Sequence, residues 1–372
     1  MARVAVVHNT LDFHGGADVV CLAVCEALQR DHDVTLYTLS ETAPLDLAER
    51  FEIALDSSRL TVRNPLGGRA VARALSTVTP VVGPQLPFRS VLIRHFFERD
   101  ASEYDLVVST ANEFDFSIPA VQYIHYPQFR PDRAAASGDS AGALNPLWSR
   151  LAGPERGEVD GSTLLANSSW TADVFERLYG VEPAVLHPPV EPIERRLDWS
   201  ERADGVVVGR IAPDKRVFDA IEIVDGVRRQ GRDLHLHIVG AAPRAYRRYV
   251  ARVERAAADR SYVTVERDVP RARLEELLRT HKYGINCKPK EHFGLSVAEY
   301  VAAGMVAFAP DSGGQREVLE EREDRLFGSV KEAIELLAAA IERNGPPNQS
   351  PTRFGRARFR ADIRAFVDET LH

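Results

Sequence analysis

Short apolar runs alternate with amphipathic stretches along the whole length of the chain. Near the start, the apolar run 4–8 precedes a helical pattern at 17–29, and the second half repeats this order. Strand, helix, strand in succession is typical of parallel sheets whose faces are covered by helices. The sequence therefore predicts an α/β fold. Further predicted strands are 106–109, 120–124, 164–167, 206–208, 234–239, 263–265 and 283–287, and further predicted helices are 171–178, 218–230, 244–257, 271–280, 295–303 and 356–371.

The length of 372 residues favours two domains, because a single hydrophobic core rarely grows beyond about 250 to 300 residues. A proline-rich, charged stretch at 187–205 interrupts the apolar periodicity and is the best candidate for a linker. We expect an N-terminal Rossmann-like domain at 1–188, a C-terminal one at 189–350 and a terminal helical segment at 351–372. Both domains are expected to be doubly wound and to face each other across a cleft, where ligands bind at the carboxyl ends of the strands.

Composition and charge narrow the class of protein further. Apolar residues make up 44% and charged residues 27%, as in ordinary globular proteins, and a net charge of -7 gives no electrostatic reason to expect a nucleic acid partner. The three cysteines match no metal or redox motif. The first apolar run stops at His8, and no stretch reaches the roughly 20 apolar residues of a membrane span. We expect a cytoplasmic protein, at most peripheral at the inner face of the cell membrane.

Two glutamates, Glu291 and Glu299, flank the start of a predicted helix. The amide groups of Gly294 and Leu295 at its N-terminus would form a cradle for an anion such as phosphate. The side chain of Glu299, one turn inside the helix, leans back toward that end and can accept hydrogen bonds from hydroxyl groups, while Glu291 can reach the other end of the same ligand. One phosphate between two hydroxyl-rich ends describes a nucleotide sugar. The alternative is that both glutamates only complement the helix dipole.

Two cations follow the first predicted strand of the second half. Arg210 comes directly after that strand, and Lys215 lies at the entry to the next helix. A guanidinium and an ammonium group suit a diphosphate and could neutralise a departing nucleoside diphosphate. As an isolated pair, they could equally be solvated surface charges.

In the first half, glycines and a histidine follow strand ends. Gly15 and Gly16 precede a helix, so the backbone there can approach a ligand closely, although a plain turn is the alternative. The dinucleotide fingerprint G-x-G-x-x-G is absent here, which disfavours a nicotinamide dehydrogenase. His125 follows the predicted strand 120–124, at the sheet edge where ligands bind, although a lone histidine is more often structural.

The stretch 57–97 contains no Asp or Glu and carries several arginines interleaved with apolar residues. Such a stretch could rest on an anionic membrane surface or bind a lipid-linked phosphate. The alternative is a solvated face of an arginine-rich protein. The arginines are Arg59, Arg63, Arg69, Arg73, Arg89 and Arg94.

Five motifs in order carry a family resemblance: the glycine pair after the first strand, YIHYP at 123–127, NSSWT at 167–171, G-R-x4-K at 209–215 and E-H-F-G-x4-E at 291–299. Together they resemble the family 4 retaining glycosyltransferases of GT-B fold. The residues of these motifs are similar to those of the dolichol-linked-oligosaccharide α-1,2-mannosyltransferases, which use GDP-mannose. This chain departs from them at Lys290, where they carry Asn, and at Gln315, where they carry Pro.

The resemblance implies a role for each matching residue. Glu299 would bind the ribose hydroxyls and Glu291 a hydroxyl of the transferred sugar. Arg210 and Lys215 would stabilise the diphosphate leaving group, and His125 would face the sugar near the acceptor. The implied catalytic residues are His125, Glu291, Arg210 and Lys215. The implied donor-binding set is Gly15, Gly16, Arg210, Lys215, Glu291, Phe293, Gly294, Leu295 and Glu299.

The expected function is that of a metal-independent retaining glycosyltransferase in glycan biosynthesis. It would move a hexose, best mannose from GDP-mannose, to a hydroxyl of a lipid-linked or glycan acceptor, with no cofactor besides the donor. The departing phosphate would take the acceptor proton. Alternatives are a UDP-glucose or UDP-N-acetylglucosamine transferase, a nucleotide-sugar epimerase and a non-catalytic nucleotide-binding subunit. A glycosidase would leave the two cations unexplained.

Overall fold

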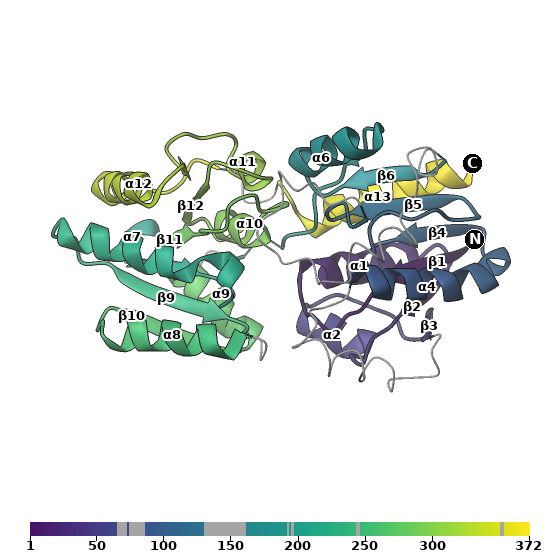
Figure 1. Cartoon of the computed structure of the whole chain (residues 1–372), viewed down its shortest axis with the longest axis horizontal. Helices are drawn as coiled ribbons and strands as arrows, with labels where there is room; N and C mark the ends of the chain where they lie inside the picture. The colour runs from purple at the N-terminus through teal and green to yellow at the C-terminus, as the bar shows by residue number, and fades with distance from the viewer. Residues whose placement is uncertain are drawn as a thin grey trace. The chain divides into compact units, whose positions relative to one another are not determined.

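The computed structural model describes residues 1–64, 73, 86–129, 161–191, 193–194, 197–242, 246–349 and 353–372. The chain divides into two compact units (Figure 1). Described residues up to Pro189 and from Arg356 to His372 form the first unit, and those from Val190 to Gly355 form the second. The predicted linker 187–205 contains this division, but its last residues already belong to a strand that begins at Ala203.

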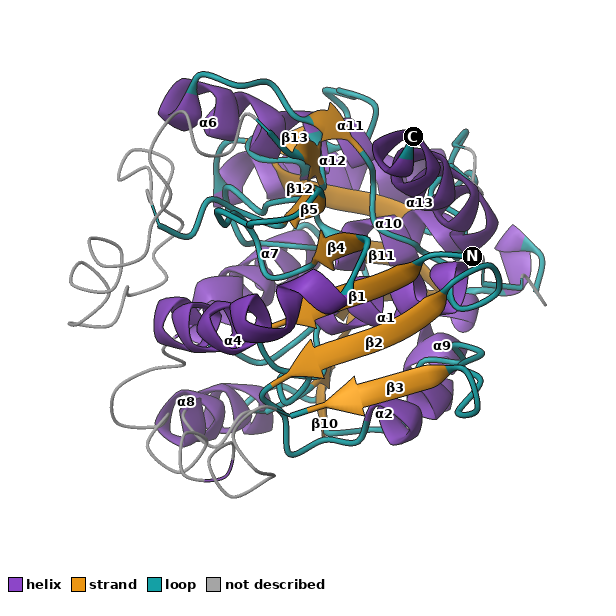
Figure 2. Ribbon diagram, turned by 90° about the vertical axis from the view of Figure 1, so that its right-hand side faces the viewer, coloured by secondary structure: helices purple, strands orange, loops and turns teal. Residues whose placement is uncertain are grey.

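The first unit is built on a seven-stranded parallel sheet in the order β3-β2-β1-β4-β5-β6-β7. Figure 2 shows β1, β2 and β3 side by side. The strand order reverses at β1 and β4, which makes the sheet doubly wound. The strands are β1 (Arg3–His8), β2 (Asp33–Thr38), β3 (Leu60–Arg63), β4 (Leu106–Ser109), β5 (Ala120–Ile124), β6 (Thr163–Ala166) and β7 (Ala184–Val185).

Both faces of this sheet are covered, as the near-continuous apolar strands require. On one face, Val4 and Val6 of β1 belong to a buried cluster with residues of helices α1 and α13, and on the other Ala5 and Val7 pack with residues of α4. The C-terminal helix α13 packs beside α1 and β5 of the first unit. The helices of this unit are α1 (Gly16–Leu28), α2 (Pro44–Arg50), α4 (Leu86–Asp100), α6 (Ser169–Tyr179) and α13 (Arg356–Leu371), with a 3-10 turn at Ala101–Glu103.

The second unit has a six-stranded parallel sheet in the order β10-β9-β8-β11-β12-β13, which reverses at β8 and β11. Val206 and Val208 of β8 point into one buried cluster and Val207 into another, so both faces of this sheet are covered as well. The strands are β8 (Ala203–Val208), β9 (His235–Gly240), β10 (Val263–Arg267), β11 (His281–Ile285), β12 (Val306–Pro310) and β13 (Leu326–Phe327). The helices are α7 (Val217–Arg229), α8 (Arg247–Ala258), α9 (Arg271–Thr280), α10 (Leu295–Ala302), α11 (Gln315–Val318) and α12 (Val330–Arg343), with 3-10 turns at Trp199–Glu201 and Pro213–Lys215.

Two covered parallel sheets confirm the predicted α/β class. The three cysteines are buried and unbridged, as free cysteines commonly are. In the part of the chain that the structure describes, no helix combines the length and the apolar character that crossing a membrane would require.

Candidate functional site

In the second unit, the predicted site residues gather at the carboxyl ends of three neighbouring strands. Arg210 and Lys215 follow β8, Glu291 follows β11, and a loop through Gly313 follows β12. Because β8 pairs with β11 and β11 with β12 in parallel, these loops lie at one edge of the sheet. The sequence analysis predicted this edge as the ligand site, and the structure brings the candidates Arg210, Lys215 and Glu291 together there.

A cluster of alternating charges forms at this edge. Lys215 Nζ lies 2.5 Å from Glu291 Oε2, and Lys288 Nζ lies 3.7 Å from Glu291 Oε1. Lys288 Nζ also lies 3.2 Å from Asp214 Oδ2, which accepts a hydrogen bond from Arg210 Nη2 at 2.9 Å. Three positive and two negative side chains leave one net positive charge. We call these five residues the charged cluster.

The charged cluster changes the titration of its buried members. Burial by itself would raise the pKa of Glu291, but the charges of Lys215 and Lys288 and the hydrogen bond from Lys215 lower it to about 2. Burial also lowers the pKa of the neighbouring His292 to about 4, where the two lysines oppose its protonation as well. At neutral pH Glu291 is therefore ionised and His292 is neutral.

Lys288 and Asp214 were missed in the sequence analysis. Lys288 follows the predicted strand 283–287, at the strand end where other candidates were sought, so its position offered a signal. Asp214 sits inside the G-R-x4-K motif, where only the two cations were considered. The structure also places Lys215 and Glu291, which were expected to contact different parts of one ligand, directly against each other.

The backbone of Glu291 is fixed by the glycine pair that follows β12. Gly314 N–H donates to Glu291 O at 2.8 Å, and Gly313 forms a bridge with Glu291. Gly313 has a φ of +78°, and a Cβ there would lie 2.4 Å from Glu291 O. Only glycine fits this close approach of two backbone segments without strain.

Gln315, the residue after the glycine pair, braces the same loop from inside. Its side chain is fully buried, and its Oε1 accepts a hydrogen bond from Asn286 Nδ2 at 2.8 Å. Its Nε2 donates to the carbonyl oxygens of Lys288, Pro310 and Ser312, each at 3.1 Å, so one of its two hydrogens is shared. One carboxamide thus ties the ends of β11 and β12 together below the charged cluster.

The start of α10 combines a backbone turn with a core contact. Gly294 precedes the helix in the left-handed region, with a φ of +103°, and Leu295 is its first residue. The side chain of Phe293 is 3% exposed and packs edge-on against Phe354, with ring centroids 5.2 Å apart. Phe293 therefore anchors the turn in the core, and its place in the donor-binding set stays a prediction.

Glu299 lies one turn inside α10 and is engaged by an arginine that the sequence analysis missed. Arg271 Nη1 lies 2.5 Å from Glu299 Oε1, and Arg271 Nε donates to Glu275 Oε1 at 3.0 Å. The negative charge of Glu299 is the largest of the causes that raise the pKa of Arg271 above its ordinary value. Since a carboxylate has two acceptor oxygens, Glu299 retains capacity for hydroxyl donors.

In the first unit, Gly15 and Gly16 lie at the start of α1 as predicted. Gly15 N–H donates to Asp18 Oδ2 at 2.9 Å, and the other oxygen of this buried carboxylate lies 3.1 Å from His8 Nε2. A Cβ at Gly15 would meet nothing within 4 Å, so its outer side is open. The pair of His8 and Asp18 was not recognised from the sequence.

His125 lies directly after β5, and the structure brings it together with another motif. Asn167, the first residue of NSSWT, donates from Nδ2 to His125 O at 3.0 Å. The imidazole is half-buried and its centroid lies 5.0 Å from that of Tyr123. The two motifs YIHYP and NSSWT therefore form one structural feature at the carboxyl edge of the first sheet.

Where the structure describes them, the arginines of the stretch 57–97 are either buried or lie within 4.0 Å of an acidic side chain. Arg89 is 2% exposed, so its side chain offers no surface for contact with a membrane. Arg63 pairs with Asp100 and Glu103, and Arg94 with Asp115, so acidic residues from outside the stretch offset the charge. Arg69 lies outside the described residues, and membrane contact stays a prediction.

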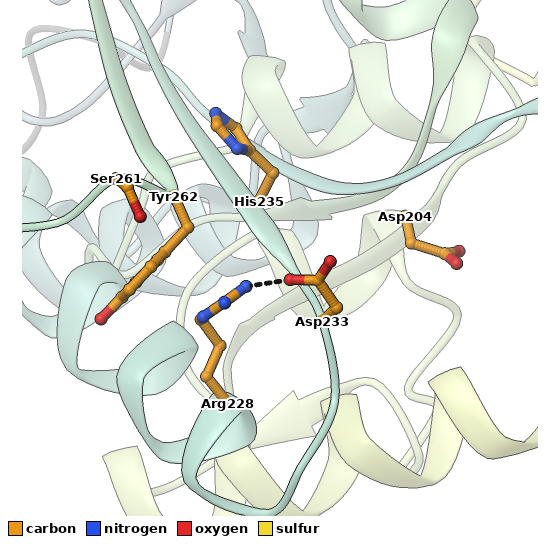
Figure 3. Close-up of a pocket in the computed structure, with 6 residues that line it drawn as sticks. All are labelled: Asp204, Arg228, Asp233, His235, Ser261 and Tyr262. Carbon is orange, nitrogen blue, oxygen red and sulfur yellow. Dashed lines mark hydrogen bonds and ion pairs between the residues drawn. The ribbon is translucent and has the colours of Figure 1, made fainter.

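A separate hollow lies at the opposite, amino edge of the second sheet (Figure 3). Its volume is about 470 Å³, and His235 at the start of β9 and Tyr262 just before β10 are among its lining residues. Arg228 and Asp233, also in its wall, pair at 2.5 Å. Since none of the predicted site residues lines it, this hollow is distinct from the charged cluster.

Comparison with known families assigns both halves of the chain. The family described as Glycosyltransferase Family 4 matches residues 14–194, and the family described as Glycosyl transferases group 1 matches residues 193–357. A GDP-Man:Man(3)GlcNAc(2)-PP-Dol alpha-1,2-mannosyltransferase of Neurospora crassa is 27% identical over 253 residues, which are 54% of this chain and 45% of that protein. The protein of the same name from Dictyostelium discoideum is 24% identical over 239 residues, 56% of this chain and 47% of that protein. The matched regions thus span less than half the length of these curated relatives.

Solved structures of similar fold cover nearly the whole chain. The crystal structure of Anabaena Alr3699/HepE in complex with UDP and glucose matches with a TM-score of 0.69 at 12% identity and covers 99% of this chain and 100% of that chain. The structure of WaaG, a glycosyltransferase involved in lipopolysaccharide biosynthesis, matches with a TM-score of 0.63 at 17% identity and covers 98% and 95%. Identities this low support the fold alone. Taken with the two family matches, they place the chain among the GT-B glycosyltransferases, and it belongs to the family 4 type.

Proposed function

We propose that this chain transfers a hexose from a nucleotide sugar to a hydroxyl group of a lipid-linked or glycan acceptor, with retention of configuration. The observation that carries this proposal is the charged cluster at the carboxyl edge of the second sheet. Its net positive charge suits the diphosphate of a donor. Family membership supports glycosyl transfer in general, and the names of the curated relatives favour GDP-mannose as the donor.

The cations of the charged cluster would stabilise the leaving group. The side chains of Lys215 and Lys288 are only 15% and 6% exposed, so water screens them weakly and their attraction for phosphate is strong. As the bond from the sugar to the phosphate oxygen breaks, negative charge grows on the diphosphate, and fixed cations stabilise that charge most. We therefore propose that the lysines and Arg210 supply this stabilisation and that no metal ion is needed.

The carboxylates would orient the donor rather than attack it. Glu291 stays ionised at neutral pH, and one of its oxygens would accept a hydrogen bond from a sugar hydroxyl while Lys215 holds the other. Glu299, similarly held by Arg271, would accept from the ribose. The acceptor hydroxyl would give its proton to the departing phosphate oxygen as the new bond forms on the same face of the sugar. Retention then requires no covalent intermediate on a carboxylate.

The test is a thermal-shift panel of GDP-mannose, UDP-glucose, UDP-N-acetylglucosamine, GDP and UDP on the wild type and on two variants. Glu299→Ala removes the proposed ribose contact, and Glu276→Ala is the control, because Glu276 is 61% exposed and pairs with Arg273 on the surface of the same unit. Ligand at about 100 times its dissociation constant stabilises the folded state by about 2.7 kcal/mol. We expect the guanine series to raise the midpoint in the wild type and in Glu276→Ala, and not in Glu299→Ala.

Product analysis separates the alternatives. Transfer to an acceptor with the donor configuration kept, seen by NMR of the anomeric proton, supports the proposal. A new nucleotide sugar formed without any acceptor would indicate an epimerase, and binding without any product would indicate a non-catalytic subunit. A shift with uridine nucleotides alone would overturn the choice of donor. No shift with any nucleotide at millimolar concentration would overturn the proposed function.

A further inference from the structure

In the loop that carries His125, residues 125–129, two side chains accept hydrogen bonds from the backbone N–H groups. Four of its N–H groups donate to oxygens of Asn112 and Glu113, which follow β4, and the fifth residue, Pro127, has no N–H to satisfy. The donors are His125 and Tyr126 to Asn112 Oδ1, at 2.7 and 3.1 Å, and Gln128 and Phe129 to Glu113 Oε1, at 2.6 and 2.8 Å. We call this arrangement the loop clamp.

The local backbone explains how two consecutive residues can face the loop. Asn112 has a φ of +69°, in the left-handed region that asparagine tolerates better than most residues, and its carbonyl accepts a hydrogen bond from Ser109 Oγ at 3.1 Å. This tight turn at the end of β4 lies beside the end of β5, because the two strands are parallel neighbours. The turn therefore directs both side chains to the segment that leaves β5.

Glu113 is a costly residue for a purely structural clamp. Its side chain is fully buried, and its Oε1 accepts a third hydrogen bond, from Tyr179 Oη at 3.0 Å. Its Oε2 is buried and, among the residues that the structure describes, has no hydrogen-bond partner. A glutamine would give the same accepting oxygen without a buried charge. Unlike an amide, the carboxyl group at this position can change its charge with pH.

The charge of Glu113 changes near neutral pH. Burial raises its pKa to about 7, although the hydrogen bonds from the loop and from Tyr179 act in the opposite direction. Among the residues that the structure describes, Tyr179 on α6 is the titratable group that donates a hydrogen bond to the carboxyl, and its other hydrogen bonds come from backbone N–H groups. The ionised form is the stronger acceptor, so it holds the loop more tightly than the protonated form does.

We propose that Asn112 and Glu113 are positioning residues for His125, and that the charge state of Glu113 sets how firmly the loop presents this imidazole. This inference rests on the proposed function and on the role that the family resemblance implies for His125, which is to face the sugar near the acceptor. It predicts that turnover rises with pH as Glu113 ionises. The binding of the donor is unaffected, because the donor contacts of the charged cluster lie in the second unit.

The experiment compares full-length Glu113→Gln and Asn112→Ala with a control, Asp105→Asn. Asp105 also accepts a backbone N–H, from Arg3 at 2.8 Å, but at an exposed site. We expect the wild type and Asp105→Asn to show a rise in kcat centred near pH 7. Glu113→Gln should lose this rise and stay at the level of the acid limb, and Asn112→Ala should lower kcat about tenfold or more. Donor affinity should change by less than about twofold in both.

Tyr179→Phe gives a second test that keeps the buried carboxyl. It removes one hydrogen bond that favours the ionised form, so the pH midpoint of kcat should move to higher pH without loss of amplitude. An unchanged pH profile in both Glu113→Gln and Tyr179→Phe would overturn the proposal. So would a parallel loss of donor affinity and turnover, since that indicates general unfolding.

Hydrogen exchange of a peptide containing residues 125–129 reads the clamp without any enzymatic assay. We expect faster exchange in Asn112→Ala and Glu113→Gln than in Asp105→Asn, and slower exchange in the wild type at pH 8 than the intrinsic pH dependence predicts from pH 6. Unchanged exchange overturns the clamp even where the chain proves to be a transferase. Faster exchange in a chain that transfers no sugar overturns the proposed function instead, and the proposed effect of the loop clamp on turnover is overturned with it.

Discussion

Replacing Lys215 with methionine should destabilise the second unit in a way that depends on pH. Methionine keeps the length and apolar stem of the side chain but removes the ammonium group that lies 2.5 Å from Glu291 Oε2. Both side chains are mostly buried, at 15% and 14% exposure, so the carboxylate that is left behind cannot recover full hydration. Lys288, at 3.7 Å, remains as a weaker partner.

The magnitude follows from the pKa of Glu291, which lies at about 2 instead of the ordinary 4.5. At about 1.4 kcal/mol for each factor of ten, this depression corresponds to about 3 kcal/mol of stability at pH 7. Because the folded pKa is the lower one, this stability is fully present above pH 4.5 and is lost as the pH falls toward 2. We expect Lys215→Met to cost about 2 to 3 kcal/mol at pH 7, and we expect the cost to shrink below pH 4.5.

The assay needs a matched control and a local probe, because a chain of two units need not unfold in one transition. Lys331→Met is the control, since Lys331 is 88% exposed and lies 3.9 Å from Glu335 on the surface of α12, where such pairs contribute little. Calorimetry at pH 7, 5 and 3.5, with hydrogen exchange of peptides from β8, β11 and α10, would report the second unit. Equal costs for the two variants, or a cost for Lys215→Met that does not change with pH, would refute the reasoning.

Two further comparisons test the division of roles and the loop geometry. Glu299→Ala should weaken donor binding at least tenfold, whereas His125→Ala should leave it unchanged and lower kcat; isothermal titration with the donor and steady-state kinetics decide this, and an equal loss of affinity in both would falsify the division. Gly313→Ala should lower the free energy of unfolding by about 2 kcal/mol or more, because the new Cβ would lie 2.4 Å from Glu291 O at a φ of +78°. Gly15→Ala, where nothing lies within 4 Å, should cost at most about 1 kcal/mol yet still reduce turnover if the donor passes close to it; thermal unfolding and kinetics of both variants provide the check.

The sequence predicts the central elements of both sheets better than the edges. The boundaries of β4, β5, α9 and α13 coincide with the predicted ones, because long apolar or amphipathic runs leave little choice of where an element begins. The strands β2, β3, β7, β12 and β13 were not predicted. β3, β7 and β13 are edge strands of four residues or fewer, and β2 begins with a charged residue, so their apolar signal is short. β12 continues the apolar run of α10, so the sequence shows no clear boundary between the two elements. Pairing with a neighbouring strand, which the sequence does not display, defines them.

The candidate site could likewise be predicted only in part. Arg210, Lys215, Glu291 and Glu299 could be proposed from the sequence because each stands after a predicted strand or within the first turns of a predicted helix. Their mutual contacts could not. The partners Lys215 and Glu291 are 76 residues apart, and Arg271 and Glu299 are 28 apart, so only the parallel order of the strands brings them together.

A motif also mixes residues that do chemistry with residues that hold the backbone, and only the structure separates them. Within E-H-F-G, Glu291 belongs to the charged cluster, Phe293 anchors the turn in the core and Gly294 provides a backbone conformation. Gln315 shows the same separation at a departure from the resembling family, which carries proline there. A proline has no carboxamide, whereas Gln315 binds three carbonyl oxygens and Asn286 at the base of the loop. The departure therefore adds a local brace to the loop that positions Glu291, and it is no argument against the chemistry proposed for that carboxylate.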